Sequence, residues 1–327
     1  MFEKILLPLD GSALAERSIP HAVAFARIFN SKIKLLRVLE PNTSSERSQF
    51  SEPLQWQLRK TEATLYLQTI AERVREALNL SQDEVTDRVN TTILEGKIAE
   101  CIVDFAQKEA IDLLVICTHG AGGLSRWNLN SVIAKVINLV YSHVLIIRTY
   151  RSKETDLRQP HYNRILIPID CSLRAECALN AGIALAEGSH PRLILTSVIK
   201  PPDVPEIAPY HQEMQALSEK LVALNHKALR YYMNEMSQRL TVDNEIHILE
   251  NASISQAILN LAKEEKADLL ILCAHGYTGD IDRPFGMVAR GCIDYGTQPV
   301  LVIQDLSRSQ VRPSEVEQVS QQTKSRE

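Results

Sequence analysis

The chain has 327 residues, of which 45% are hydrophobic and 23% charged, and a formal net charge of −4 at pH 7. This length fits about two domains, each long enough to bury a core of its own. The slight negative charge gives no reason to expect a nucleic acid or an anionic membrane as partner. No apolar run is long enough to span a bilayer, and the first residues do not resemble a secretory signal. We therefore expect a cytoplasmic protein, in which the six cysteines are free thiols.

The strongest pattern is an internal repeat. The run K-I-L-L-P-L-D at 4–10 recurs as R-I-L-I-P-I-D at 164–170, and D-L-L-V-I-C-T-H-G at 112–120 recurs as D-L-L-I-L-C-A-H-G at 268–276. The two copies are offset by about 160 residues early and about 156 late, so only loop lengths differ. The repeat predicts two similar domains, at 1–150 and 164–305, joined by a polar linker at 151–163. We expect the polar tail, 306–327, to be disordered.

Strands and helices alternate within each copy. In the first copy we predict strands at 4–9, 32–39, 88–94, 113–117 and 144–149. Helices are predicted from Ser12, as the cap, to about Asn30, and then at about 54–78, 97–110 and 131–141. The continuous apolar runs fit strands that are buried on both faces, as in parallel sheets. This alternation is typical of a doubly wound α/β sheet, whose ligand lies beyond the carboxyl ends of the strands where their order reverses.

The longest helix of each copy is predicted to bury one apolar stripe. In the first copy this stripe consists of Leu54, Leu58, Leu65, Ile70, Val74 and Leu78. In the second copy the helix at about 212–240 should bury Leu217, Leu221, Leu224, Ala228 and Leu240.

A glycine-rich segment follows the fourth strand of each copy and leads into a helix. Glycine lets the backbone approach an anion closely, and the free N–H groups of the first helical turn point at it. The sequence therefore predicts a phosphate-binding loop between Cys117 and Ser131, at the same mouth as Asp10 and Val38.

These residues resemble the universal stress protein family in a tandem form. The resemblance rests on P-L-D-G-S at 8–12, P-I-D-C-S at 168–172 and the T-H-G and A-H-G loops, and it covers nearly the whole chain. It implies two tandem five-stranded parallel-sheet domains, Rossmann-like and adenine nucleotide alpha hydrolase-like. In the family's nucleotide-binding members, a motif G-x-x-G, nine residues, then G and Ser or Thr holds phosphates. An Asp after the first strand holds the ribose, and the main chain of the second strand meets the adenine.

The resemblance implies one candidate site in each copy. The first consists of Asp10, Val38, Gly120, Asn130, Ser131 and Val132, and the second of Asp170, Val198, Gly276, Gly286, Met287 and Val288. Each copy departs from the motif twice, with Cys117 and Asn130 in the first and Cys273 and Met287 in the second.

The departures favour the first copy as the triphosphate site. Met287 removes a hydroxyl donor, a loss of about 1 kcal/mol for one hydrogen bond. Asp280 and Asp282 would repel phosphates unless a cation bridges them, whereas the first loop offers Arg126. We expect the second copy to bind a smaller adenine ligand or none.

Other interpretations of these residues stay open. Asp10 and Asp170 either hold a ribose or cap the following helix. His119 and His275 have no paired carboxylate or nucleophile in view, so we expect structural roles for them. No P-loop and no metal-binding motif occurs. We therefore expect no enzyme, with slow ATP hydrolysis left open.

Three functions are compatible with the sequence. The first is an adenine-nucleotide-binding module of the stress response, which binds ATP or another adenine nucleotide, with or without Mg²⁺, and acts through partner or dimer interactions. The second is a scaffold of the same fold that needs no nucleotide, and the third and weakest is a hydrolase or nucleotidyl-transfer enzyme. We also expect the fifth strands of the two copies to pair in an intramolecular pseudo-dimer, with a protein partner and a homodimer left open.

Overall fold

The computed structural model describes residues 1–41, 52–80, 85–118, 131–148, 160–206, 209–277 and 283–306. The strands of the first half are β1 (Lys4–Pro8), β2 (Lys32–Leu39), β3 (Val89–Glu95), β4 (Leu113–Cys117) and β5 (His143–Ile147). Those of the second half are β6 (Arg164–Pro168), β7 (Arg192–Ile199), β8 (Asn244–Glu250), β9 (Leu269–Cys273) and β10 (Val300–Ile303).

Helices connect these strands. The first half has a short 3₁₀ helix η1 (Ala15–Ser18), then α1 (Ile19–Phe29), α2 (Glu52–Leu78), α3 (Val85–Arg88), α4 (Ile98–Lys108) and α5 (Ser131–Leu139). The second half has α6 (Glu176–Ser189), α7 (His211–Arg239), α8 (Ile254–Glu264) and α9 (Met287–Tyr295). Element ends differ from the sequence prediction by a few residues, and the single turn α3 was not predicted.

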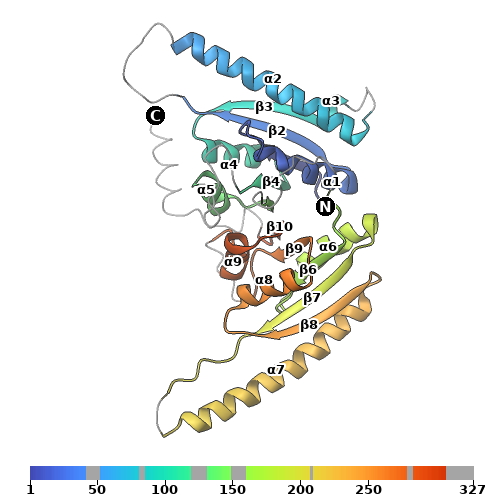
Figure 1. The fold of residues 1–327 in the computed structure, drawn as a ribbon, viewed down its shortest axis with the longest axis vertical. Helices are drawn as coiled ribbons and strands as arrows, with labels where there is room; N and C mark the ends of the chain where they lie inside the picture. Colours follow the sequence, from blue (N-terminus) through green and yellow to red (C-terminus); the bar gives the residue numbers. More distant parts are fainter. Residues whose placement is uncertain are drawn as a thin grey trace.

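All strands belong to one sheet, in the order β3-β2-β1-β4-β5-β10-β9-β6-β7-β8 (Figure 1). Within each half the strands are parallel. The halves meet where β5 and β10 pair in antiparallel fashion, with Val300 opposite Ile146. The predicted α/β fold and the predicted pairing of the two fifth strands are both present, and the strand order reverses between β1 and β4 and between β6 and β9.

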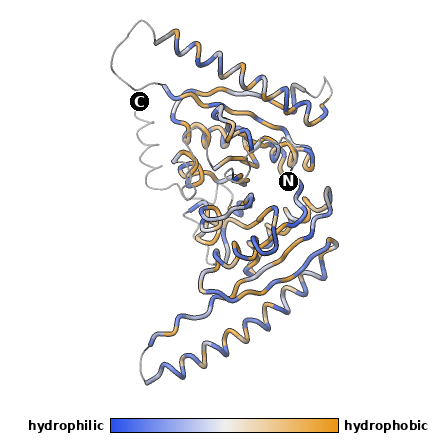
Figure 2. Tube along the Cα trace, viewed as in Figure 1, coloured by the Kyte–Doolittle hydropathy of each residue, from blue (hydrophilic) through white to orange (hydrophobic). Residues whose placement is uncertain are grey.

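The core lies on both faces of the sheet and continues across the two halves. One buried cluster includes Ile5 and Ile165 together with residues of α1, α2, α6 and α7. The other includes Leu6 and Leu166 together with residues of α4, α5, α8 and α9. Figure 2 shows the strands as the most continuously hydrophobic part of the chain. Successive strand residues face opposite helix layers, which explains the unbroken apolar runs of the sequence.

Local hydrogen bonds shape the start and end of the first helical segment. The Ser12 hydroxyl accepts a hydrogen bond from the Ala15 N–H at 3.1 Å, but the N-cap residue of η1 is Leu14 and not the predicted Ser12. Helix α1 ends at Asn30, whose left-handed backbone (φ 53°) suits asparagine better than most residues.

The predicted buried stripes of α2 and α7 are wrong in part. Ile70 and Val74 of α2 are buried, but Leu54, Leu58 and Leu65 are exposed. In α7 the exposed predictions are Leu217, Leu221, Leu224 and Ala228, while Met233 and Met236 contact the sheet instead. The physical reason is that both helices carry apolar residues on more than one side, and only one side of each packs against the sheet.

Several predictions lie outside the described residues, among them the linker residues 151–159 and the tail from 307 onward. Within the described ranges, no helix is both long and apolar enough to cross a membrane.

Candidate functional site

The mouth of the first half lies where β1 and β4 end side by side. Asp10 follows β1, and its Oδ1 accepts hydrogen bonds from the backbone N–H of Ser12 at 2.9 Å and from the Ser12 hydroxyl at 2.5 Å. At the end of β4, the Cys117 thiol donates to the Leu14 carbonyl at 3.0 Å. These bonds form a local turn ahead of η1, whose N-cap residue is Leu14, and Asp10 is exposed. Both predicted roles of Asp10, ribose binding and helix capping, stay predictions.

Arg37 is a residue of this mouth that the sequence analysis missed. Its Nη1 donates to the Leu9 carbonyl at 3.3 Å, and its guanidinium lies 2.9 Å from the point where a Cβ on Gly11 would be. Burial lowers the pKa of Arg37, and the negative charge of Asp10 acts in the opposite direction. Its buried Nε has no hydrogen-bond partner in the described part of the chain. A cationic donor therefore lies beside the Asp10 carboxylate, which is predicted to bind the ribose.

The remaining predicted residues of the first site are only partly described. Val38 lies half-buried near the end of β2, paired with Leu94 of β3. Ser131 and Val132 form the start of α5, and Ser131 is exposed. Gly120 and Asn130 lie outside the described residues, as do His119 and Arg126.

In the second half, the carboxylate of Asp170 at the equivalent mouth is bonded to its own chain. Asp170 Oδ1 accepts from the Ser172 N–H and hydroxyl, at 3.0 and 2.6 Å. Its Oδ2 accepts from the backbone N–H of Tyr277 at 2.7 Å. A Cβ on Gly276 would lie 2.1 Å from that oxygen, so this glycine is required by the carboxylate itself. Three protein donors take up most of the acceptor capacity of Asp170.

The first turn of α9 completes this second mouth. Gly286 is its N-cap residue, with an ordinary φ of −69°, and Met287 is 86% exposed at the position where the motif has a hydroxyl. Val288 is exposed, and Val198 lies half-buried in β7. Cys273 meets the thiol of Cys177 with their sulfur atoms 3.2 Å apart. Asp280 and Asp282 lie outside the described residues.

His275 has a paired carboxylate, contrary to the expectation from sequence. Its Nδ1 lies 2.7 Å from Oδ1 of Asp305, and its Nε2 lies 2.7 Å from the Arg283 carbonyl oxygen. Both partners are acceptors, so both ring nitrogens donate and the ring carries a positive charge. Burial lowers the pKa of His275, but these hydrogen bonds outweigh burial and raise the pKa above 6.5. Asp305 follows β10, which neighbours β9, so two strand ends bring the pair together. The predicted structural role fits these contacts.

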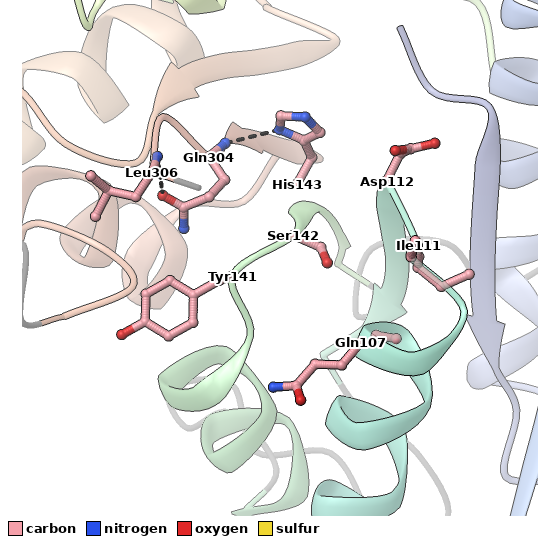
Figure 3. A pocket seen from close by; sticks show the side chains of 10 residues that line it. Gln107, Ile111, Asp112, Tyr141, Ser142, His143, Gln304 and Leu306 are labelled. Atoms are coloured by element: carbon pink, nitrogen blue, oxygen red, sulfur yellow. Dashed lines mark hydrogen bonds between the residues drawn. The ribbon is translucent and has the colours of Figure 1, made fainter. Parts of the chain in front are cut away.

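A separate pocket lies where the two halves of the chain meet (Figure 3). It has a volume of about 290 Å³ and is lined by Asp112, Tyr141, Ser142, His143, Gln304 and Leu306, among others. His143 Nδ1 accepts from the Gln304 N–H at 2.9 Å, and burial lowers the pKa of His143. The pocket lies at the amino ends of β4 and β5, and none of the predicted site residues lines it.

Within the ranges that the structure describes, no three His, Cys, Asp or Glu residues are grouped so that they could hold a metal ion.

The sequence profile of the universal stress protein family matches residues 1–148 and 161–304. A universal stress protein of Mycolicibacterium smegmatis is 25% identical over 309 residues, which cover 91% of this chain and 96% of that protein. The crystal structure of a universal stress protein from Archaeoglobus fulgidus covers 92% of this chain and 96% of its own, with a TM-score of 0.60 and 16% identity. One universal stress protein solved in complex with cAMP covers 45% of this chain and 98% of its own, at 20% identity and a TM-score of 0.33.

Proposed function

The chain belongs to the universal stress protein family, and we propose that it is a cytoplasmic adenine-nucleotide-binding module of the stress response whose nucleotide binds at the first mouth. The observation that carries this proposal is the difference between the two mouths. At the first, the cation of Arg37 lies beside Asp10, and the exposed Ser131 begins α5. At the second, an exposed methionine takes the place of that serine and begins α9.

Each described part of the first mouth has a task in this proposal. The N–H groups at the start of α5 and the Ser131 hydroxyl bind phosphate oxygens. Asp10, beyond the end of β1, accepts hydrogen bonds from ribose hydroxyls. The backbone at Val38 meets the adenine. ATP or another adenine nucleotide, with or without Mg²⁺, is then the ligand.

The proposed action is regulatory. Hydrolysis needs a positioned base or a metal-bound water, and no residue of the described mouth is placed for that task. Nucleotide bound at the first mouth would instead change the surface offered to a protein partner. The universal stress protein in complex with cAMP is an example of a family member with an adenine nucleotide. Its likeness to this chain is too limited to choose the ligand, and the proposal rests on the residues of the mouth.

Calorimetric titration of ATP into nucleotide-stripped protein tests this function, with Asp10→Asn and Asp170→Asn as a matched pair. Asparagine keeps one oxygen that can accept from the serine cap in each half. We expect binding to weaken at least about tenfold in Asp10→Asn, which corresponds to about 1.4 kcal/mol, and to change little in Asp170→Asn. Equal binding by all three proteins would contradict the first mouth as the site.

A second function is favoured for the second half alone. Its strand-end carboxylate, Asp170, and its histidine, His275, bond to their own chain, and a side chain at Gly276 would displace that carboxylate. We propose that this half is a structural partner, which supplies β10 to cover the edge strand β5. Absence of ATP binding at millimolar concentration in the whole protein would extend this scaffold role to both halves.

A further inference from the structure

Helix α7 carries a row of apolar side chains that contact nothing in the described part of the chain's core. Leu217, Leu221 and Leu224 are 66%, 47% and 54% exposed. The complete row is Met214, Leu217, Leu221, Leu224, Ala228 and Tyr231, which we call the α7 seam. Its spacing alternates between three and four residues throughout. This is the a/d heptad repeat with which one helix packs along another in a coiled coil.

The α7 seam is distinct from the side of α7 that packs against its own sheet. That side contains the buried Met233 and Met236, and Tyr232, whose hydroxyl donates to Glu176 at 2.6 Å. The first half offers a comparison within the same chain. The exposed leucines of α2, Leu54, Leu58 and Leu65, would share a heptad row with Thr61, Gln68 and Glu72. An unbroken apolar row is therefore a property of α7 and not of the fold.

The position of α7 leaves the α7 seam accessible. Helix α7 lies along β8, and its N-terminal end extends away from the rest of the molecule (Figure 1). Residues 212–217 are all exposed, as expected for a segment beyond the sheet. Hydrophobic residues nevertheless recur along this part of α7 (Figure 2). An apolar row on a projecting helix indicates an intermolecular contact.

We propose that the α7 seam pairs with the α7 seam of a second copy of this chain, in an antiparallel coiled coil centred near residue 219. The first four residues of the row are self-complementary in this register, and Ala228 and Tyr231 lie beyond the overlap. Met214 packs against Leu224 of the partner copy, and Leu217 against Leu221 of the partner copy, each pair occurring twice. Because the two projecting ends overlap, the two folded bodies lie at opposite ends of the coil and do not collide.

Charges beside the seam select this register. Glu213, Lys220 and Lys227 occupy the g positions, and none of them has an ion-pair partner among the described residues. In antiparallel coils, g positions of the two helices face each other. When the coil is centred near residue 219, Glu213 lies beside Lys227 of the partner copy, and this attractive contact occurs twice. One repulsive contact, between the two copies of Lys220, occurs as well. A shift by half a heptad, which centres the coil between residues 222 and 223, would instead place Lys220 against Lys227 twice. A parallel coil would place all three charges opposite neutral side chains.

Sedimentation velocity of the whole chain over a range of concentrations tests the dimer. We expect a concentration-dependent dimer for the wild type and a monomer for Leu217→Glu/Leu221→Glu, whose dissociation constant should rise more than about a hundredfold. The matched control is Ala216→Glu/Ala223→Glu, which adds the same charges one and two residues away, off the seam, and should stay dimeric. Circular dichroism of both double variants should match the wild type. A monomeric wild type at about 100 μM, or a dimer that survives Leu217→Glu/Leu221→Glu, would overturn the proposal.

A charge exchange tests the antiparallel arrangement. Glu213→Lys and Lys227→Glu should each weaken the dimer by roughly tenfold, because each replaces two attractive contacts with two repulsive ones. The double variant Glu213→Lys/Lys227→Glu should return to the wild-type dissociation constant. Additive weakening in the double variant would overturn the antiparallel register.

Discussion

The carboxylate of Asp170 and the backbone N–H of Tyr277 form a hydrogen bond of 2.7 Å that joins the ends of β6 and β9. The bond runs directly over Gly276, where a Cβ would lie 2.1 Å from the carboxylate oxygen. A glycine that belongs to a phosphate-binding motif in relatives therefore has an internal reason to be glycine here. The same residue type at the same place need not imply the same ligand.

This contact predicts a specific cost for Gly276→Ala. The new methyl group must displace Asp170 and break its bond to Tyr277, so we expect a loss of about 1–3 kcal/mol of stability in urea unfolding. Gly286→Ala is the control. Its Cβ would meet nothing closer than 3.4 Å at an ordinary φ, so its cost should stay within about 1 kcal/mol. Equal costs for both variants would show that Asp170 does not hold this loop in place.

The pair of His275 and Asp305 predicts a pH window of stability. The pKa of His275 is raised above 6.5, so its contribution is complete below pH 6.5 and is lost as the pH rises through the raised value. For Asp305, burial raises the pKa, but the hydrogen bond and charge of His275 lower it below 3.8 overall. Its contribution is therefore lost as the pH falls through that lowered value. Between about pH 3.8 and 6.5 the pair stabilises the fold fully.

The variant His275→Gln removes this charge and keeps a side chain that can form a hydrogen bond. It leaves Asp305 buried beside Arg174 alone, which lies 3.5 Å away, so we expect a loss of about 3 kcal/mol at pH 6. The loss should shrink as the pH rises above the pKa of His275. Thermal unfolding across this pH range is the measurement, and a loss that does not depend on pH would argue against a charged His275.

His21 should make the protein sensitive to acid. Its Nδ1 lies 2.6 Å from the Tyr162 hydroxyl, a contact between α1 and the segment before β6. Burial lowers the pKa of His21 to about 4, so protonation favours the unfolded chain. Stability from this neutral ring is complete above pH 6.5 and falls by about 3 kcal/mol as the pH falls to about 4, since each pKa unit corresponds to about 1.4 kcal/mol. His21→Gln should remove that part of the pH dependence, and an unchanged acid profile would contradict a neutral, buried His21.

Much of the fold could be predicted because strands buried on both faces have an unmistakable pattern. Leu113–Cys117 is apolar at every position, and every residue of β4 is buried. The meeting of β5 and β10 could be predicted from their apolar edges, whereas their antiparallel direction was not predicted. The face of a long helix was harder to predict, because Leu58 and Ile70 of α2 both belong to regular apolar rows. Only the packing of the sheet decides which row is buried.

The candidate site could be predicted less completely. Asp10 and Asp170 stand directly after strands, and the sequence places them well. Arg37 was missed because its role depends on which face of β2 it occupies, next to Gly11 in the loop after β1. Asp305 was missed because it lies thirty residues from His275. One signal was available, since each of the two residues follows the end of an apolar run by two positions.

The most direct test of the account is the number of ATP molecules bound per chain, measured by equilibrium dialysis for the wild type, Ser131→Met and Met287→Ser. The two variants exchange the residue types found at the start of α5 and α9. We predict about one ATP per chain in the wild type and none in Ser131→Met. Met287→Ser should still bind one, because its second mouth keeps the bond between Asp170 and Tyr277. Two ATP molecules per wild-type chain, or full binding in Ser131→Met, would contradict the first mouth as the nucleotide site.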